Sequence, residues 1–290
     1  MDQILYHYCG LDAFLSIIKN STLWLSDIRK SNDYLECVYC RDKINEKIRG
    51  FLEDDKEALE AWDFGYNINS DLSMDMISYV ACFSENKDQL SQWRGYADNG
   101  AGIAVGFSRE SFADLKEAAP SHISFRKVIY DEKEQEKFIE RIARESIKAM
   151  ETKPVAQVAA ELNQNYRLQF PVLKNASFEE EAEWRIIFND SFSKRKRHVG
   201  KNILFSGIRY TVREKRLVSY IEMDFSKLKY NAIKEIWIGP KAEVEIQDIL
   251  HLLDVYGYYD DVENYNESAP IKIAHSASSY RSALTSKNNY

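Results

Sequence analysis

The sequence has few of the residues that build metal and redox sites. It contains only four cysteines, and its five histidines do not cluster. Cys37-Val-Tyr-Cys40 would be half of a zinc site or a redox pair, but no second Cys or His pair follows at ligand spacing. We therefore expect reduced cysteines in a cytoplasmic protein and no metal centre.

Several recognisable motifs are also missing. No apolar run reaches the roughly 18 residues that a membrane-spanning helix needs. The N-terminus lacks the basic-then-apolar pattern of a signal peptide. There is no Walker loop, no G-x-G-x-x-G and no G-x-S-x-G nucleophile motif. The sequence therefore predicts no membrane-spanning helix, and it lacks the commonest motifs of nucleotide-binding proteins and hydrolases. We also expect no contact with membranes.

What the sequence does contain is an unusual segment in its first half. Tyr79 to Glu85 is typical of a strand, Asp88 to Asp98 of a loop and short helix, and Gly100 to Phe107 of a second strand. Aromatic, hydroxyl and glycine positions are concentrated here, a mixture that suits a small-molecule pocket better than simple packing. Gly102 and Gly106 suggest close backbone approach.

The whole chain of 290 residues, 44% of them hydrophobic, is long enough for one large domain or two small ones with a hydrophobic core. We expect an α+β fold in a single domain, residues 1–290. Its core would be a mixed or antiparallel sheet with flanking helices and a helical insertion at about 109–170. The expected strands cover 5–8, 22–26, 79–85, 100–107, 122–130, 182–188, 217–223, 233–240 and 271–275. The main helices are expected at 11–18, 34–53, 131–153, 154–170 and 242–253, with 54–76 as irregular surface structure.

Two local patterns make sharper predictions. Leu11, Phe14, Leu15 and Ile18 recur at helical spacing and predict one buried helix face. The segment Ser177-Phe-Glu-Glu180 has the spacing of a capping box and predicts a helix start.

The strand expected at 182–188 carries two opposite charges on one face. Alternation places Trp184, Ile186 and Phe188 toward the core and Glu183 with Arg185 on the other side. A carboxylate and a guanidinium over an apolar layer would form a fixed polar floor. The alternative is a surface ion pair worth less than about 1 kcal/mol.

Four further side chains are candidates for a site. His7 lies on the first strand, on the face opposite Tyr6 and Tyr8, and its alternative role is a structural hydrogen bond. Ser84 ends a strand and would otherwise cap a turn. Trp93 and Tyr96 are helical neighbours, which would otherwise pack in the core.

The charge distribution is uneven. The net charge is −7, yet residues 193–216 contain nine basic residues and one acid. Such a basic strip on an acidic protein is a candidate phosphate site. The run formed by Lys194, Arg195, Lys196 and Arg197 is the expected nucleic-acid contact, and a solvated loop is the alternative.

Short motifs spread over nearly the whole chain resemble a known family. They are Leu5-Tyr-His-Tyr8; Trp24-Leu-Ser26 with Asn32, Asp33 and Glu36; Cys82-Phe-Ser-Glu85 with Trp93, Tyr96, Ala97 and Gly102; Glu180-Glu-Ala-Glu-Trp-Arg185; Ile238-Gly-Pro240; and Ser279-Tyr-Arg281. In this order they look like the bacterial family labelled domain of unknown function 2971. That family in turn resembles the ADP-ribosyltransferase fold with its split sheet.

The resemblance implies a pocket for NAD as substrate. His7 would hold a ribose hydroxyl and Glu183 would bond the nicotinamide ribose, so both are expected to act in catalysis. Ser84, Trp93 or Tyr96 would share the remaining contacts. Tyr8 and Ser26 are expected at the pocket from the matching segments, and Arg185 or Arg94 would pair with the pyrophosphate. We expect His7 and Glu183 to converge across one crevice.

The expected function is therefore an NAD-dependent ADP-ribosyltransferase that acts as an intracellular toxin or anti-phage defence effector. The basic strip favours RNA or DNA as acceptor, and such a toxin implies an antitoxin or inhibitory partner. Two alternatives stay open. One is a non-catalytic nucleotide sensor, and the other is an RNA-processing nuclease that uses His198.

Overall fold

The fold was analysed in a computed structural model, which describes residues 3–30, 34–73, 78–112, 115, 123–189, 197–199, 203–213, 215–259 and 271–280. Twelve strands in these ranges form one mixed sheet, in the order β12-β11-β4-β1-β3-β2-β10-β8-β7. Off this path, β6 pairs with β3, β5 pairs with β6, and β9 pairs with β10. The strands are β1 (Ile4–Cys9), β2 (Thr22–Asp27), β3 (Ser78–Ser84), β4 (Ile103–Ser108), β5 (Ile123–Lys127), β6 (Glu183–Asn189), β7 (Arg197–Val199), β8 (Ile203–Phe205), β9 (Arg209–Arg213), β10 (Arg216–Asp224), β11 (Ile233–Ile238) and β12 (Lys272–His275).

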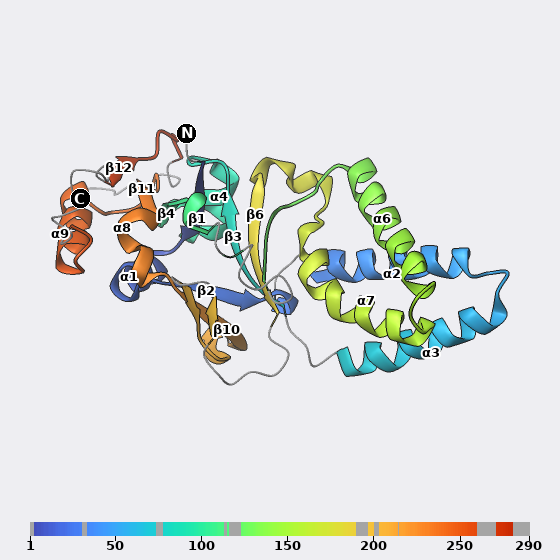
Figure 1. The fold of residues 1–290 in the computed structure, drawn as a ribbon. Helices are drawn as coiled ribbons and strands as arrows, with labels where there is room; N and C mark the ends of the chain where they lie inside the picture. Colours follow the sequence, from blue (N-terminus) through green and yellow to red (C-terminus); the bar gives the residue numbers. More distant parts are fainter. Residues whose placement is uncertain are drawn as a thin grey trace.

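Helices cover the sheet and extend beyond its edge (Figure 1). The α-helices are α1 (Leu11–Asn20), α2 (Tyr34–Phe51), α3 (Lys56–Ser73), α4 (Leu90–Tyr96), α6 (Glu132–Met150), α7 (Val155–Gln169), α8 (Lys229–Ala232) and α9 (Ile246–Val255). None of the helices in the described ranges combines the length and hydrophobicity needed to cross a bilayer. The α+β class expected from the sequence is confirmed, with a mixed sheet because β12 runs parallel to β11.

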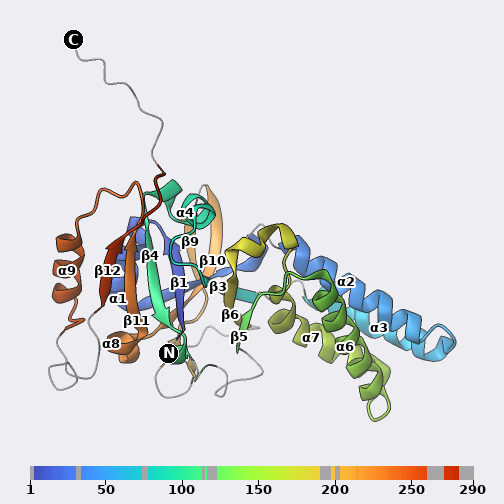
Figure 2. The same ribbon diagram turned by 90° about the horizontal axis from the view of Figure 1, so that it is seen from above.

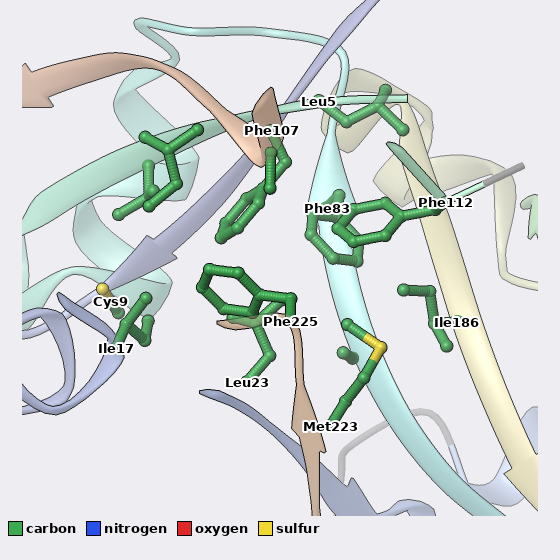
Figure 3. Packing of buried hydrophobic residues seen from close by; sticks show 14 of the residues in the cluster. Leu5, Cys9, Ile17, Leu23, Phe83, Phe107, Phe112, Ile186, Met223 and Phe225 are labelled. Carbon is green, nitrogen blue, oxygen red and sulfur yellow. The ribbon is translucent and has the colours of Figure 1, made fainter. Parts of the chain in front are cut away.

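One face of the sheet carries the main hydrophobic core. Leu5 of β1, Phe83 of β3 and Ile186 of β6 point into it, as the period-two alternation of these strands requires (Figure 3). Phe107 meets Phe83 edge-to-face, with ring centroids 5.9 Å apart. These contacts fix the register of β1, β3, β4 and β6, on which the candidate site is built.

A second core lies inside a four-helix group beyond β5 and β6 (Figure 2). In this group α2 packs against α6, and α3 packs against α7. The helices come from two separated stretches, 34–73 and 132–169, so the helical part is not confined to the insertion expected at about 109–170.

Residues 54–76 were expected to be irregular, and this is wrong because α3 occupies most of them. The Asp55 side chain accepts a hydrogen bond from the Ala58 amide at 3.0 Å, as an N-cap residue does. Trp62 and Tyr66 then stack at i, i+4 in the second core. The many acids of the stretch occupy the outer side of the helix and hide this pattern.

Three smaller expectations are corrected. The buried face of α1 is Phe14, Ile17 and Ile18, whereas Leu11 and Leu15 are exposed. The helical turn at Ala176–Glu181 is capped by the Asn175 side chain, not by Ser177. The helix expected from residue 242 begins only at Ile246, where Glu245 and Asp248 form a capping box.

Candidate functional site

The sheet is split along one edge of β3. Ser84 at the end of β3 pairs with Tyr6 of β1, while Val80 near its start pairs with Ser26 of β2. In the described ranges, residues 81–83 have no strand partner on this edge, because β1 and β2 diverge there. The split therefore leaves backbone groups of β3 to be satisfied by side chains.

His7 of β1 fills this need. Its Nδ1 lies 2.9 Å from the Cys82 carbonyl oxygen, and its ring packs beside Phe83 with centroids 5.8 Å apart. Since a carbonyl can only accept, Nδ1 carries the proton. Burial lowers the pKa of His7, the bond to Cys82 opposes this, and the positive charge of Arg213 lowers it further. A neutral His7 with a protonated Nδ1 keeps Nε2 as a hydrogen-bond acceptor.

Glu183 reaches the same strand from its other edge. It lies directly opposite Ser84 in the pairing of β6 with β3, and the Cys82 side chain hydrogen-bonds to its carboxylate. Because Ser84 also pairs with Tyr6, Glu183 shares the face of Tyr6, and His7 lies on the opposite face. The two groups thus flank Cys82 from opposite edges and opposite faces of β3, rather than facing each other across a simple crevice.

Glu183 belongs to a buried network of two acids and two bases. Lys174 Nζ lies 2.5 Å from Glu181 Oε2 and 3.2 Å from Glu183 Oε2. Arg185 donates to Glu183 through Nε at 2.8 Å and Nη2 at 2.7 Å, and through Nη1 to the Pro171 carbonyl at 2.7 Å. All four side chains are buried. Two positive and two negative charges compensate each other here, and buried charges are tolerated only when they are paired in this way.

The environment of Glu183 keeps its carboxylate ionised. Burial by itself raises the pKa of Glu183, but the charge and hydrogen bonds of Arg185, then Lys174 and Cys82, lower it to about 2. The expectation of a polar floor formed by Glu183 and Arg185 is confirmed in its orientation, with Trp184, Ile186 and Phe188 on the core side. It is a buried pair and not the surface ion pair of the alternative reading.

Two exposed aromatic rings adjoin this network. The Tyr96 hydroxyl donates to Glu181 Oε1 at 3.3 Å, and its side chain is 49% exposed. The Phe178 ring lies 5.0 Å from Lys174 Nζ and is 42% exposed. The network therefore meets the protein surface at an aromatic rim, where a planar ligand can stack.

Sequence reasoning missed Lys174, Glu181 and Phe178 as members of this site. Glu181 lies two residues before Glu183, a spacing that could have indicated a second carboxylate on the same side. Lys174 carries no comparable signal, because it follows a buried Leu173 and approaches the acids only through the fold of residues 170–182.

Other expected cofactor contacts are already engaged within the protein. The Tyr8 hydroxyl donates to the Asn86 carbonyl at 2.7 Å. Ser84 Oγ donates to the Glu181 carbonyl at 2.7 Å and accepts from the Asn86 amide. Trp93 is fully buried and donates to Asp88 at 2.7 Å. Ser26 is half-buried beside the split. Cofactor binding by these residues stays a prediction.

The expected pyrophosphate contacts differ in accessibility. Arg185 is 1% exposed, and its guanidinium bonds Glu183 and the Pro171 carbonyl. Arg94 is exposed on α4, 5.9 Å from the Tyr280 ring. Lys194, Arg195 and Lys196 lie outside the described residues, as do the side chains of Arg197 and His198, whose backbone is in β7.

The cysteine pair is described only in part. Cys40 is buried in the second core, and the Cys37 side chain lies outside what is described. Over the residues that the structure describes, no group of three His, Cys, Asp or Glu side chains is arranged to hold a metal ion.

A cleft of about 1050 Å³ lies between α2 and α6. Tyr130 and Lys174 line it, together with charged residues of both helices such as Lys47 and Glu140. Tyr130 also accepts a hydrogen bond from the Glu183 amide at 3.0 Å. The cleft therefore borders the buried network at Tyr130 and Lys174, although neither His7 nor Glu183 lines it.

Comparisons with known proteins give limited information. Neither the curated proteins nor the solved structures contain a significant match, so the likeness to the ADP-ribosyltransferase fold stays a prediction. One family model does match: over residues 92–186, which include most of α4, Lys174 and Glu183, the chain is similar to the protein family of unknown function DUF2971, as its motifs predicted.

Proposed function

We propose that this protein is an NAD-dependent ADP-ribosyltransferase that acts as an intracellular toxin or defence effector. The observation that carries the proposal is the arrangement around Cys82, which has His7 on its carbonyl and Glu183 on its side chain. An imidazole acceptor and an ionised carboxylate are thus held by one strand at a split in the sheet. Since they lie on opposite faces of β3, one ribose would contact both only through that split, between β1 and β2.

The proposed reaction breaks the bond between C1′ of the nicotinamide ribose and the ring nitrogen of nicotinamide. The bonding electron pair leaves with nicotinamide, and the ribose acquires positive charge at C1′. Glu183, ionised at every physiological pH, stabilises that charge and orients a ribose hydroxyl. The acceptor then forms a bond to C1′ and loses its proton to solvent or to a nearby base.

Two other side chains have surfaces that suit this substrate. Nε2 of His7 can accept a hydrogen bond from a ribose hydroxyl, because Nδ1 is already used by Cys82. The half-exposed ring of Tyr96 can stack on the nicotinamide, with its hydroxyl anchored to Glu181. Trp93, a fully buried residue of α4, anchors the helix that presents Tyr96.

A second function is favoured by one specific observation. The Glu183 side chain is only 6% exposed and contacts both Arg185 and Lys174, so its charge is largely compensated inside the protein. A site of this kind suits a non-catalytic module that binds a nucleotide and leaves it intact. Such a module is stabilised by its ligand without any chemistry.

The test uses the purified chain with NAD labelled in the nicotinamide ring, with and without total RNA or lysate. We expect free nicotinamide and labelled acceptor, and a loss of at least about 100-fold in rate for Glu183→Gln. Glu179→Gln, an exposed neighbour, is the matched control. Unfolding curves of both variants show whether the fold is kept.

Three outcomes separate the alternatives. Unchanged nicotinamide release by a folded Glu183→Gln protein removes this carboxylate from the mechanism. A rise in Tm with NAD and no nicotinamide release supports the binding module. Shortened RNA beside intact NAD indicates a nuclease instead. Of the two acceptor classes, RNA is our first choice over DNA, because the basic strip favours a flexible single strand.

A further inference from the structure

Two cations lie over one aromatic ring beside α4. Lys241 Nζ is 3.7 Å and Arg94 Cζ is 5.9 Å from the centre of the Tyr280 ring. Arg94 is exposed, whereas Lys241 and Tyr280 are half-buried. An aromatic face attracts a cation, so the ring holds two like charges close together. We call these three residues the Tyr280 cluster.

The Tyr280 cluster lacks an acid. Among the residues that the structure describes, no carboxylate forms an ion pair with Arg94 or with Lys241. Two acids close by in sequence to Arg94 are engaged elsewhere. Asp88 accepts hydrogen bonds from three other donors, and the Asp98 carboxylate lies against Gly10 at the start of α1. The two positive charges are therefore uncompensated in the described part of the chain.

A similar arrangement on the same sheet provides a contrast. Lys87 Nζ and Lys272 Nζ lie 4.7 and 5.4 Å from the centre of the Trp237 ring. There, Glu235 accepts a hydrogen bond from Trp237 Nε1 at 2.7 Å and lies 3.6 Å from Lys272 Nζ. An anion supplied from outside the chain would complete the Tyr280 cluster as Glu235 completes this one.

The loop after α4 holds the Tyr280 cluster in position. The Tyr280 hydroxyl donates to Asn99 Oδ1 at 2.7 Å, and the Lys241 amide donates to the Gly100 carbonyl at 2.8 Å. Asp98, Asn99 and Gly100 have φ angles of 47°, 55° and 93°, so three successive residues are left-handed. This conformation is uncommon outside glycine, and such strain is concentrated at ligand-binding and other functional sites.

The chemistry of the Tyr280 cluster suits phosphate groups on a strand. A guanidinium can donate two parallel hydrogen bonds to one phosphate, and an ammonium adds a point charge. Two such contacts on an exposed surface hold a small anion only weakly. A nucleic-acid strand combines them with further contacts along its length. Cations beside aromatic rings are typical of proteins that bind single strands.

We propose that the Tyr280 cluster binds the phosphate backbone of a single-stranded nucleic acid. Arg94 is two residues from Tyr96, in a helix of seven residues that is about 10 Å long. A strand held by Arg94 therefore needs to cross only this short helix to reach the aromatic rim of the candidate site. As the place of the acceptor, the inference rests on the proposed function, and it assigns Arg94 to the acceptor instead of the pyrophosphate of NAD.

The experiment is fluorescence anisotropy with a labelled single-stranded RNA of about ten uridines, at several salt concentrations. We expect the affinity to fall about 5-fold in Arg94→Ala and in Lys241→Ala, and the slope of log K against log salt to shrink by about 0.7 in each. Arg94→Lys should lose less, because lysine keeps the charge. Lys272→Ala removes a compensated charge and should change the affinity by less than about twofold. Tm values show whether each variant keeps the fold.

Several results would overturn the inference. They are absence of RNA binding by the unaltered protein, unchanged affinity and salt slope in both alanine variants, or an equal loss in Lys272→Ala. Displacement of the RNA by an equal concentration of oligoglutamate of the same length would make the cluster a contact for an acidic protein instead.

Nicotinamide release without RNA is measured separately. A protein that releases nicotinamide but does not bind the RNA keeps the proposed reaction and loses this site. RNA binding that needs Arg94, in a protein that releases no nicotinamide, refutes the transferase and supports this site.

Discussion

Arg185 donates two parallel hydrogen bonds to the Glu183 carboxylate, from Nε to Oε1 at 2.8 Å and from Nη2 to Oε2 at 2.7 Å. Both side chains are almost completely withdrawn from water. A buried charge that loses its partner costs several kcal/mol, so each of these groups depends on the other. The pair also contacts Lys174, which joins it to Glu181.

This dependence can be measured with a double-mutant cycle. Arg185→Met should destabilise the protein by about 3–5 kcal/mol, because Glu183 is left with only part of its compensation. Adding Glu183→Gln to that variant should recover part of the loss. The free energy of unfolding in urea gives the coupling. Strict additivity of the two substitutions would show that the pair is not coupled.

The same carboxylate predicts a loss of stability in acid. The pKa of Glu183 is lowered from 4.5 to about 2 in the folded protein. The native state therefore binds fewer protons than the unfolded state between these values. Its contribution is complete above pH 4.5 and disappears as the pH falls toward about 2. Unfolding free energies over this range should depend less on pH in Glu183→Gln, whereas Glu179→Gln should follow the unaltered protein.

His7 predicts a second pH dependence, at higher pH. Its pKa is lowered below the ordinary value of 6.5, first by burial and also by Arg213. A histidine whose pKa is lower in the folded than in the unfolded protein favours the native state above pH 6.5, where the ring is neutral in both states. This contribution to stability is lost as the pH falls through the pKa of the folded state. Nitrogen NMR should find Nδ1 protonated and Nε2 bare at neutral pH. His7→Gln should remove this part of the pH dependence, and a protonated Nε2 at pH 7 would contradict the assignment.

The strand faces around the site could be predicted because alternation is a local property. Trp184 and Ile186 point to the core and Glu183 points away, as their period-two pattern requires. His7 is likewise on the face opposite Tyr8. The divergence of β1 from β2 along β3 has no local sequence signal, because it depends on the pairing of distant strands. The contact of His7 with the Cys82 carbonyl follows from that divergence and could not be derived.

Polar partners from outside the strands were harder still to predict. Lys174 and Glu181 reach Glu183 because residues 170–182 fold in short helical turns beside β6, and helical turns of this length have weak sequence signals. The helix α3 was missed for a different reason. Its apolar positions, Trp62 and Tyr66 among them, are few and are surrounded by acids that face solvent.

The close backbone approach of Gly102, just before β4, to Cys9 of β1 gives a stability prediction. A Cβ at this position would overlap the Cys9 carbonyl oxygen, and backbone cannot move aside as a side chain can. Gly102→Ala should therefore destabilise the protein by 2 kcal/mol or more, about the cost of other severe core clashes. Gly50→Ala, in α2 with no atom near the added methyl, should be neutral or stabilising by up to about 1 kcal/mol. Equal Tm values for the two variants would exclude the clash.

Asp88 holds the segment after β12 against α4. Its Oδ1 accepts from Trp93 Nε1 at 2.7 Å and from Ser276 Oγ at 2.5 Å, and its Oδ2 accepts from the Ala277 amide at 2.8 Å. Asp88→Ala should cost about 1–3 kcal/mol, because these donors lose a shared acceptor. Hydrogen exchange should become faster in α4 and around Tyr96.

A milder variant tests the segment after β12 without changing the contacts of α4. Tyr280→Phe removes only the bond from its hydroxyl to Asn99 Oδ1 at 2.7 Å and keeps the ring near Lys241. It should speed exchange near Asn99 and leave the amides of α4 as they are. Unchanged exchange in α4 of Asp88→Ala would mean that the helix is held by Trp93 packing alone.

The four-helix group can be completed only after most of the first 170 residues have been synthesised. Helices α2 and α3 are made first, but their apolar sides are covered chiefly by α6 and α7, which follow after β3, β4 and β5. Until residue 169 has emerged from the ribosome, that surface is open to chaperones or to other nascent chains. A fragment that stops before α6 should consequently aggregate, and residues 109–170 expressed alone should not form a separable unit.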